Sequence, residues 1–424
     1  MFIYYHLKNE NAEKVITTQG NKMHPISSTS IESLPNELLL PILEACVVPS
    51  LFSVCKRWSH LLSTEVIPTL YKQIGKVHVP QGDINKQALI VDKIYKLEEK
   101  LSEIAKVNAI FKQAFALSKS LAPAELEFKW KTQEKRYYTL ANYSSYLINI
   151  NRLLMWEALP GGGEFLDQEK IKYLPLEKQG EFLRDWIERY GKDITSLDLT
   201  GIGLTYLPSE IGQLSKLQRL FIGYNQLTTV PAEIGRMSQL QELDLSHNQL
   251  TSLPAEIGQL SKLQTLDLNQ NQLITLPTEI EQLSELQWLY LNQNQLTSLP
   301  AEIGRLSQLQ TLYLNHNQLT ALPTEIGQLS QLQGLYLYQN HLTSLPVEIG
   351  RLSQLQWLDL NQNQLTSLPT EIGQLSQLQT LELNQNQLTS LPAEIGQLSQ
   401  LKWFELAENP LKDINEKIRQ RFQL

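Results

Sequence analysis

The stretch LQGLYLYQNHLTSLPVEIGRLSQ, from Leu332 to Gln354, decides the fold of this chain, because variants of it follow one another from Ile194 to Leu411. The period is always 23 residues, and the apolar residue that opens each copy recurs at Ile194, Leu217, Leu240, Leu263, Leu286, Leu309, Leu332, Leu355, Leu378 and Leu401. A fixed period of this kind indicates a unit that stacks on its neighbours. Such an array offers an extended binding surface rather than a pocket for chemistry.

Each copy reads as one coil with a strand on its inner side. The alternation in Leu332–Leu337 predicts a short strand whose Leu335 and Leu337 side chains face inward. The slot of Asn340 is asparagine in nine of the ten copies: Asn225, Asn248, Asn271, Asn294, Asn317, Asn340, Asn363, Asn386 and Asn409. A buried amide at a turn must find hydrogen-bond partners, so these asparagines are predicted to form a structural ladder between neighbouring coils.

The second half of each copy predicts a short helical turn on the outer side of the coil. Pro346 suits the first helical position, and Glu348 in the first turn favours the helix dipole. The equivalent acids are interpreted as a solvated capping row and not as catalytic acids: Glu233, Glu256, Glu302 and Glu325. Ile202 in place of asparagine fits an atypical end copy, whereas Glu281 in place of glycine has no explanation at this level.

This pattern is the signature of a leucine-rich repeat solenoid. In such a solenoid the outward strand residues line the concave face of a parallel sheet. The slot between the two strand leucines reads Asp198, Phe221, Asp244, Asp267, Tyr290, Tyr313, Tyr336, Asp359, Glu382, Glu405. The slot two residues earlier reads Ser196, Arg219, Glu242, Thr265, Trp288, Thr311, Gly334, Trp357, Thr380, Trp403. With about 4.8 Å between strands, these side chains spread along roughly 45 Å.

The centre of the concave face is aromatic and its flanks are acidic. Tryptophan and tyrosine are enriched at binding hot spots, and the repeat leucines already build the core without them. Drift on a solvated face would also vary these slots, but the sequence favours a site for a protein with basic segments, steered by charge. The predicted contact residues are Phe221, Asp244, Asp267, Trp288, Tyr290, Tyr313, Tyr336, Tyr338, Trp357, Asp359, Glu382 and Trp403.

Charge and cysteine content exclude several classes. The chain carries a net charge of −8, but residues 194–411 hold 7 basic and 19 acidic side chains (7 − 19 = −12), which argues against a nucleic-acid partner. Cys46 and Cys55 are the only cysteines, so neither a disulfide framework nor zinc spacing is present, and a reducing compartment is expected. Because no apolar run approaches 18 residues and Met1–Leu7 lacks a basic signal region, a cytoplasmic protein without membrane insertion is expected.

The segment before the repeats contains two short amphipathic patterns. Ile31–Leu43 reads IESLPNELLLPIL, and Val54–Leu61 reads VCKRWSHL. Ser33 or Asn36 suits the cap of a first helix, and Leu51 to Leu62 place a second apolar face on the next one. Two such helices expose more apolar surface than they bury, which suggests a partner helix.

These residues resemble the F-box, the three-helix module of ubiquitin-ligase substrate receptors. The resemblance covers about residues 31–76. In that family the equivalent positions dock on the Skp adaptor of a cullin–RING ligase, and C-terminal repeats hold the protein to be ubiquitinated. Carried over by position, the adaptor-binding residues would be Leu34, Pro35, Leu38, Leu39, Ile42, Leu43, Val54, Cys55 and Trp58.

Two departures from the F-box pattern stand out. The spacing from Leu43 to Val54 is shorter than in the family, and Leu70-Tyr71 stands where Leu-Trp is customary. Both departures would weaken the adaptor contact by shifting the later helices. The alternative is a helical hairpin that merely packs on the middle region of the chain.

Residues 83–190 are expected to be mostly helical. Apolar residues at 3–4 spacing predict a helix that belongs to a linker bundle or to a short coiled coil: Ile94, Leu97, Leu101, Ile104, Phe111 and Phe115. A second helix is expected over Glu134–Trp156, ending before a turn at Pro160–Gly163 that lacks the lysine of a phosphate loop. Two helices are expected to cap the ends of the array, with apolar faces formed by Phe182, Leu183, Trp186, Ile187 and Tyr190 and by Ile414, Ile418 and Phe422.

The predicted fold class is mixed α+β: an N-terminal all-α F-box and helical linker, followed by a leucine-rich-repeat solenoid with a parallel concave sheet. The predicted division is a flexible tail at 1–30, the F-box-like segment at 31–76, a helical linker region at 77–177, an N-terminal cap helix at 178–193, ten repeats at 194–411 and a C-terminal cap helix at 412–424.

The resemblance implies a substrate-receptor adaptor of an SCF-type ubiquitin ligase, with the Skp adaptor and a captured target protein as partners. The alternative is a leucine-rich-repeat scaffold or inhibitor with no ligase role. No catalytic residues, cofactor or metal are expected, and because no cysteine follows Cys55, a C-terminal catalytic cysteine is excluded. The near-identical LPxEIG units resemble bacterial repeats, which suggests a secreted effector acting in the cytosol of a host cell.

Overall fold

The computed structural model describes residues 60–78, 84–98, 100–103, 105–107, 109–110, 113, 140–174, 176–412 and 414–422. The adaptor-binding residues predicted between Leu34 and Trp58, and the predicted tail, lie outside these ranges. In the described part of the chain no helix is both long and apolar enough to cross a membrane.

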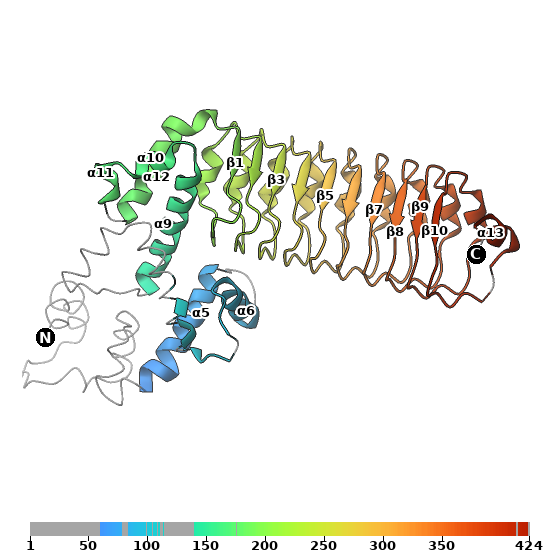
Figure 1. The fold of residues 1–424 in the computed structure, drawn as a ribbon, viewed down its shortest axis with the longest axis horizontal. Coiled ribbons are helices and arrows are strands. Elements are labelled where there is room, and N and C mark those ends of the chain that lie inside the picture. Colours follow the sequence, from blue (N-terminus) through green and yellow to red (C-terminus); the bar gives the residue numbers. More distant parts are fainter. Residues whose placement is uncertain are drawn as a thin grey trace, which may run out of the picture.

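The repeats form an elongated solenoid with one open sheet (Figure 1). All ten strands are parallel and lie in sequence order. They are β1 (Ser196–Asp198), β2 (Arg219–Phe221), β3 (Glu242–Asp244), β4 (Thr265–Asp267), β5 (Trp288–Tyr290), β6 (Thr311–Tyr313), β7 (Gly334–Tyr336), β8 (Trp357–Asp359), β9 (Thr380–Glu382) and β10 (Trp403–Glu405). This arrangement confirms the predicted α+β leucine-rich-repeat fold.

Each of the first nine coils carries a short 3₁₀ helix on the side opposite the sheet. These helices are η5 (Ser209–Gln213), η6 (Ala232–Arg236), η7 (Ala255–Gln259), η8 (Thr278–Gln282), η9 (Ala301–Arg305), η10 (Thr324–Gln328), η11 (Val347–Arg351), η12 (Thr370–Gln374) and η13 (Ala393–Gln397). The helical turn was predicted, but the place of its proline was wrong. Pro346 precedes the first helical residue, with φ −66 and ψ 147, because extended backbone is needed there to turn the chain into η11.

The core is a continuous column of aliphatic side chains between the strands and the 3₁₀ helices. In the coil that contains β7, Leu335, Leu337, Leu342 and Ile349 are all fully buried. Each such side chain stabilises the fold by about 1.5–3 kcal/mol when it leaves water. A single coil cannot enclose these groups, so stability comes from stacking on the neighbouring coils.

The predicted asparagine ladder is present. The Oδ1 atom of Asn340 accepts a hydrogen bond from the N–H of Leu319 in the preceding coil (3.0 Å), and its Nδ2 donates to the carbonyls of Leu314 (2.9 Å) and Leu337 (3.1 Å). At the start of the array, Asn225 bonds the N–H of Gly203 and Leu204 in the same way. The ladder therefore satisfies buried backbone groups that no sheet ladder reaches.

The glycine of each outer turn is explained by close stacking. A Cβ atom at Gly304 would lie 2.3 Å from the carbonyl oxygen of Glu325 and 2.8 Å from its Cβ. Glu281 stands in the equivalent slot of η8, and its carboxylate pairs with Arg305 at 2.7 Å. This ion pair to the next coil gives the carboxylate a partner, but nothing in the structure explains why glycine is replaced here.

We expect Gly304→Ala to destabilise the array by about 1–2 kcal/mol, because backbone and side-chain atoms of Glu325 must shift to admit the new methyl group. Gly396→Ala is the matched control, since nothing lies within 4 Å of a Cβ atom there. Urea denaturation of both variants checks the prediction. Equal unfolding midpoints would contradict it.

The N-terminal end of the array is capped by a small helical unit: α9 (Leu140–Ala158), α10 (Gly162–Leu166), α11 (Glu169–Lys172), α12 (Leu176–Tyr190) and the 3₁₀ turn η4 (Gly191–Asp193). Trp156 of α9 and Trp186 of α12 are buried, with ring centroids 5.9 Å apart. The turn before α10 uses Gly161 at φ +78, a conformation that favours glycine.

Helix α9 supplies polar groups to the first repeat, which lacks its ladder asparagine. Asn151 Oδ1 accepts hydrogen bonds from the N–H groups of Thr205 (2.9 Å) and Tyr206 (3.2 Å). Arg152 pairs with the buried Glu210 at 2.7 Å. The apolar face predicted for α12 was too wide, since Leu183 and Ile187 are buried but Phe182 and Tyr190 are exposed. The exposed Tyr190 still packs on the buried Trp186, with ring centroids 5.5 Å apart.

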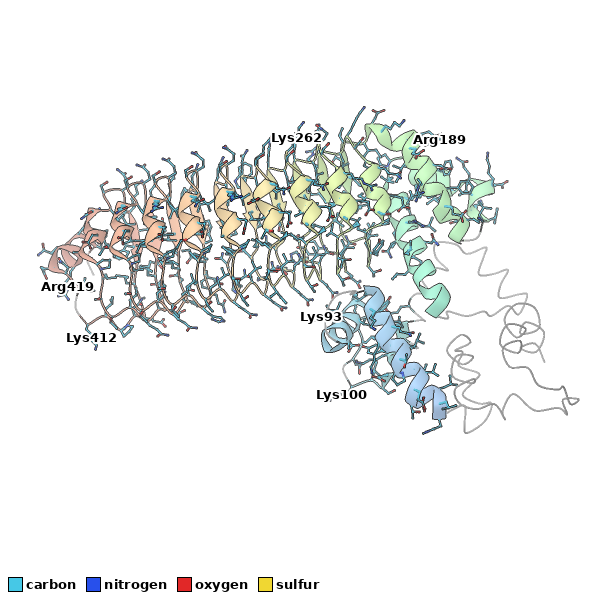
Figure 2. The ribbon with its side chains drawn as sticks, turned by 180° about the vertical axis from the view of Figure 1, so that it is seen from behind. Lys93, Lys100, Arg189, Lys262, Lys412 and Arg419 are labelled. Carbon is cyan, nitrogen blue, oxygen red and sulfur yellow. The ribbon has the colours of Figure 1, made fainter. Side chains whose placement is uncertain are left out.

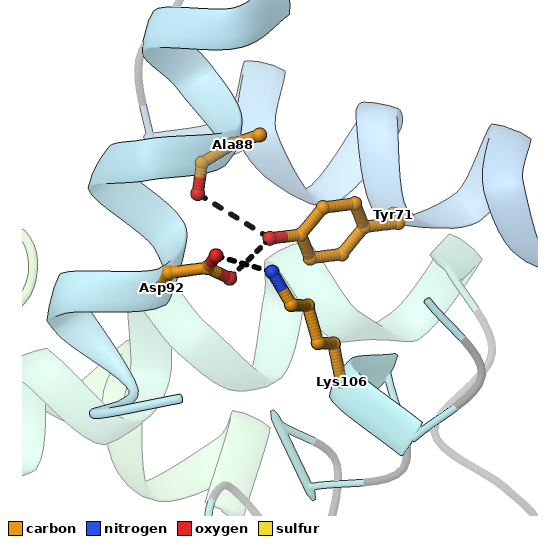
Figure 3. Close-up of polar contacts among 4 residues, drawn as sticks. All are labelled: Tyr71, Ala88, Asp92 and Lys106. Carbon is orange, nitrogen blue, oxygen red and sulfur yellow. Dashed lines mark hydrogen bonds and ion pairs between the residues drawn. The ribbon is translucent and has the colours of Figure 1, made fainter. Parts of the chain in front are cut away.

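A second helical unit contains the π-helical turn η3 (Leu62–Val66), α5 (Ile67–His78) and α6 (Ile84–Ile94). Figure 3 shows its polar centre, where the Tyr71 hydroxyl donates to a carboxylate oxygen of Asp92 while Lys106 forms an ion pair with that carboxylate. Burial is the main cause that raises the pKa of Tyr71, with Asp92 adding to it. Tyr71 therefore faces the chain's own helices.

The continuous helix predicted from Ile94 onward is wrong at its start. Helix α6 ends at Ile94, and Lys96 adopts φ +50, which no right-handed helix contains. A new helical segment begins only after Ser102, so the 3–4 spacing across Leu97 spans a turn and not one helix face. The unit also reaches the array, because Thr228 of the second coil donates a hydrogen bond to the carbonyl of His78.

The C-terminal end is covered by α13 (Glu416–Phe422). Ile418 is buried, and the rings of Phe404 and Phe422 meet edge to face at 4.9 Å. Arg421 donates to the carbonyls of Gly396 and Leu398 in the ninth coil. These contacts cover apolar surface that the final strand would otherwise leave open.

Candidate protein-binding face

The strand register brings the two outward slots into straight rows. Residues at the same position of neighbouring coils are direct pairing partners, for example Trp288 with Thr311 and Tyr290 with Tyr313. We call the surface formed by the two outward slots of the ten strands the sheet face. It corresponds to the concave face of the sequence analysis, and it contains every predicted contact residue except Tyr338, which follows β7.

Three tyrosines stack at the centre of the sheet face. The rings of Tyr290 and Tyr313 lie 4.8 Å apart at 7°, and those of Tyr313 and Tyr336 lie 4.6 Å apart at 10°. The spacing equals the distance between strands, so the parallel register itself produces the stack. Gly334 leaves room for it, because a Cβ atom there would lie 2.9 Å from the Tyr336 ring.

Indole rings flank the tyrosine stack in the other outward row. Trp288 on β5 is half-buried, whereas Trp357 on β8 is 40% exposed. Trp403 on β10 is 57% exposed and donates its indole N–H to Glu405 at 2.9 Å. Phe221 is half-buried. Because it belongs to β2, it lies near the N-terminal end of the same face, apart from the central aromatic group. Tyr338 lies beside the sheet, where its ring meets His316 edge to face at 5.0 Å.

The sheet face is strongly acidic. Its two rows hold one basic residue, Arg219, and seven acids (1 − 7 = −6): Asp198, Glu242, Asp244, Asp267, Asp359, Glu382 and Glu405. Within the described ranges none of the seven forms an ion pair with a lysine, arginine or histidine. Figure 2 shows the opposite side of the array, where the labelled Lys262, Arg189 and Arg419 belong to a coil edge and to the two caps.

A second row of asparagines, which the sequence analysis missed, lies immediately after the strands. The Oδ1 atoms of these asparagines accept hydrogen bonds from the backbone N–H groups of the next coil, each at 2.8 Å: Asn269 from Asn292, Asn292 from Asn315, and Asn315 from Tyr338. Asn361 and Asn384 continue the pattern in the last coils. The recurrence of asparagine two residues before the ladder slot was the signal available in the sequence.

The strand aspartates complete this second row. In some coils the preceding coil has no asparagine at the position of this second row. There the backbone N–H donates instead to the aspartate two residues earlier in its own coil: Ser246 to Asp244 (2.8 Å), Asn269 to Asp267 (2.8 Å) and Asn361 to Asp359 (3.0 Å). These acids therefore support the backbone as well as charging the face. The presence of aspartate rather than tyrosine at these positions follows partly from this structural requirement.

Asp267 and Asp359 are the titratable groups most perturbed on the sheet face. Burial raises the pKa of Asp267 to about 6, the hydrogen bond from Asn269 acts in the opposite direction, and the charge of Asp244 adds to the rise. Burial likewise raises the pKa of Asp359 to about 6, with Glu382 and Glu405 adding to the rise. Burial also raises the pKa of Tyr290 and Tyr336. Because the pKa values of Asp267 and Asp359 are raised, keeping these two carboxylates charged at neutral pH lowers the stability of the fold.

A pH dependence follows from these two pKa values. An aspartate titrates near 3.9 in the unfolded chain, so the folded array binds more protons between about pH 4 and pH 6, and its unfolding free energy falls as the pH rises through that window. We expect Asp267→Asn/Asp359→Asn to be more stable than the wild type at pH 7.5 by about 1 kcal/mol, allowing for solvent screening, and the difference to shrink at pH 4.5.

Thermal unfolding at both pH values measures this effect. Asp198→Asn is the control. The hydrogen bonds from Thr200 lower the pKa of Asp198, so the charged carboxylate stabilises the folded protein and its replacement should lower stability at pH 7.5. A difference between the double variant and the wild type that is the same at both pH values would contradict the prediction.

Comparison with known families agrees with this geometry. The family described as "Leucine rich repeat" matches residues 192–250 and 238–296, and the family described as "Leucine-rich repeat region" matches residues 279–356 and 344–414. A leucine-rich-repeat protein of Leptospira interrogans is 38% identical, with 56% of this chain and 72% of that chain covered and a TM-score of 0.44. This chain is a leucine-rich-repeat protein.

Two other solved leucine-rich-repeat structures are also similar to this chain. The ectodomain of the Arabidopsis thaliana receptor kinase GASSHO1/SCHENGEN3, solved with CASPARIAN STRIP INTEGRITY FACTOR 2, is 38% identical over 51% of this chain and 27% of its own length, with a TM-score of 0.47. The repeat domain of the type III effector XopL is 26% identical over 61% of this chain and 90% of its own, also at 0.47. The curated proteins contain no match.

Proposed function

We propose that this leucine-rich-repeat protein is a binding module that holds a protein partner on its sheet face. The observation that carries the proposal is the stack of Tyr290, Tyr313 and Tyr336, with Trp288 and Trp357 beside it, set in an acidic surface. Large aromatic side chains surrounded by polar groups are the usual composition of an interface centre and its rim.

The energetics of the face support binding rather than a purely structural role. The leucines and the ladder asparagines hold the coils together without the tyrosines, and Asp267 and Asp359 are charged at a cost to stability. Groups that cost stability in the free protein are expected where a partner restores the balance. In this proposal the protein performs no chemistry itself. In the described ranges no cluster of three His, Cys, Asp or Glu side chains is placed to hold a metal ion.

Photo-crosslinking tests this function. A benzoylphenylalanine introduced at Trp357, on the sheet face, is compared with one at Val347, which is 53% exposed on η11 on the opposite side. We expect one protein to be crosslinked specifically from position 357 and not from position 347. Equal crosslinking from both positions, or crosslinking from 347 alone, would place the interface elsewhere.

A second candidate is a more specific binding role, that of a substrate receptor of an SCF-type ubiquitin ligase. The sequence of Ile31–Leu43 and Val54–Leu61 favours it, since that segment resembles an F-box and precedes the repeats as in such receptors. The C-terminal part of the F-box-like segment argues against this role, because Leu70 and Tyr71 are buried against the chain's own helices and are not exposed to an adaptor. An action as a bacterial effector in a host cell stays a prediction that depends on this candidate.

Binding of the purified protein to the Skp adaptor decides the second candidate. Tight binding that is lost in Leu34→Ala/Pro35→Ala and in Trp58→Ala, with the repeats still folded by circular dichroism, would support a ligase receptor. No binding by the folded wild-type protein would remove that role and leave the binding module.

A further inference from the structure

Asp267 and Asp359 bracket the tyrosine stack symmetrically. Asp267 on β4 pairs in register with Tyr290, and Asp359 on β8 pairs with Tyr336. The same row thus reads Asp, Tyr, Tyr, Tyr, Asp across five adjacent strands. A more acidic zone continues outward on both sides, with Asp244 beyond one end and Glu382 beyond the other.

The two carboxylates are held in place and oriented. One oxygen of each accepts a backbone N–H, from Asn269 at 2.8 Å and from Asn361 at 3.0 Å. No described residue bonds the second oxygen of either group, and no described cation pairs with them. Each end of the stack therefore presents a fixed acceptor for a positively charged donor.

The spacing of the two carboxylates matches an extended peptide that crosses the strands. Four strand intervals of about 4.8 Å separate β4 from β8, which gives roughly 19 Å. An extended chain advances about 3.3 Å per residue, so two of its residues would be about six positions apart to reach both carboxylates. Six is an even number, so both side chains would point to the same face of the peptide.

The stack between the carboxylates defines the intervening positions. The second and fourth residues after the first basic residue also point to the sheet face, above Tyr290, Tyr313 and Tyr336. Apolar side chains there would cover the rings and exclude water. Exclusion of water strengthens the ion pairs at both ends, because the local dielectric falls.

We propose that the sheet face binds an extended peptide segment with two basic residues six positions apart and apolar residues at the second and fourth positions between them. The segment crosses β4 to β8, with one basic side chain on Asp267 and the other on Asp359. This inference rests on the proposed function and names the chemistry of its partner.

Fluorescence anisotropy with labelled synthetic peptides tests the register. The probe is GRSLSLSRG, in which the arginines are six positions apart, and the matched probe is GRSLSLRSG, which has the same composition and charge with the arginines five apart. We expect the second peptide to bind at least about fivefold more weakly, because its second arginine points away from the sheet. The acidic peptide GESLSLSEG should not bind.

Three charge-matched variants of the full-length protein test the site. Asp267→Asn and Asp359→Asn are each expected to weaken GRSLSLSRG binding about fivefold or more, since the amide keeps the backbone hydrogen bond but loses the charge. Asp198→Asn removes the same charge from the same row three strands away from β4, and it should change affinity less than about twofold.

Three outcomes would overturn the inference. Equal binding of the two arginine peptides, or an equal loss in Asp198→Asn, would show attraction to net charge alone. An absence of binding at about 1 mM peptide to the folded protein would show that no such segment is held. The proposed function would survive any of these results if crosslinking from position 357 still identified a partner.

Discussion

Asn340→Ala is expected to destabilise the repeat array by about 3 kcal/mol. The truncation leaves the N–H of Leu319 without its acceptor. The carbonyls of Leu314 and Leu337 each lose one of two amide donors and keep the other, from Asn317 and Asn363 respectively. A buried polar group that loses its partner costs about 1–3 kcal/mol. Because Asn340 lies in the middle of the array and bonds the preceding coil, the loss cannot be absorbed by fraying at one end.

Urea denaturation followed by circular dichroism measures this loss. Ser344→Ala in the same coil is the control, since Ser344 is exposed and its effect should stay within about 0.5 kcal/mol. Asn409→Ala offers a second comparison, because Asn409 is partly exposed in the last coil and should cost less. If Asn340→Ala unfolded at the same urea concentration as Ser344→Ala, the ladder would not have the stabilising role assigned to it.

Tyr313→Ala is expected to weaken binding of the protein partner at least about 30-fold, which corresponds to about 2 kcal/mol. Tyr313 is the middle ring of the stack and contacts both Tyr290 and Tyr336. Its removal takes away contact area at the centre of the proposed interface and leaves the two outer rings unsupported. The relevant measurement is calorimetric titration with the partner identified by crosslinking.

Tyr173→Ala controls for the loss of a tyrosine as such, because Tyr173 is 62% exposed after α11 and lies off the sheet face. Its affinity should match that of the wild type. Unchanged affinity in Tyr313→Ala, with the protein folded, would refute a binding role for the tyrosine stack.

The regular period made most of the array predictable. A repeat of 23 residues without insertion fixes which residues pair across neighbouring strands, so the two outward rows and the asparagine ladder followed from counting alone. Asn340 and its equivalents were recognisable because a buried amide that recurs with this period lies beside the backbone of the neighbouring coil and can bond it.

Features that depend on contacts between particular neighbours were less accessible. The aspartates were predicted as binding residues only, and their bonds to Ser246, Asn269 and Asn361 depend on what occupies the preceding coil. The left-handed turn at Lys96 has no glycine to mark it, so the apolar spacing there predicted an unbroken helix. For Phe182 and Tyr190, helix periodicity could not define how wide a face the first repeat covers.

The sheet face, around its tyrosine stack, is proposed as the place where this protein binds its partner. Chemical labelling of tyrosines in the wild-type protein, with and without the partner, followed by mass spectrometry, measures this without any mutation. We expect Tyr290, Tyr313 and Tyr336 to become protected when the partner is added, while Tyr173 and Tyr190 react as before. Unchanged labelling of the three stacked tyrosines in a saturated complex would contradict it.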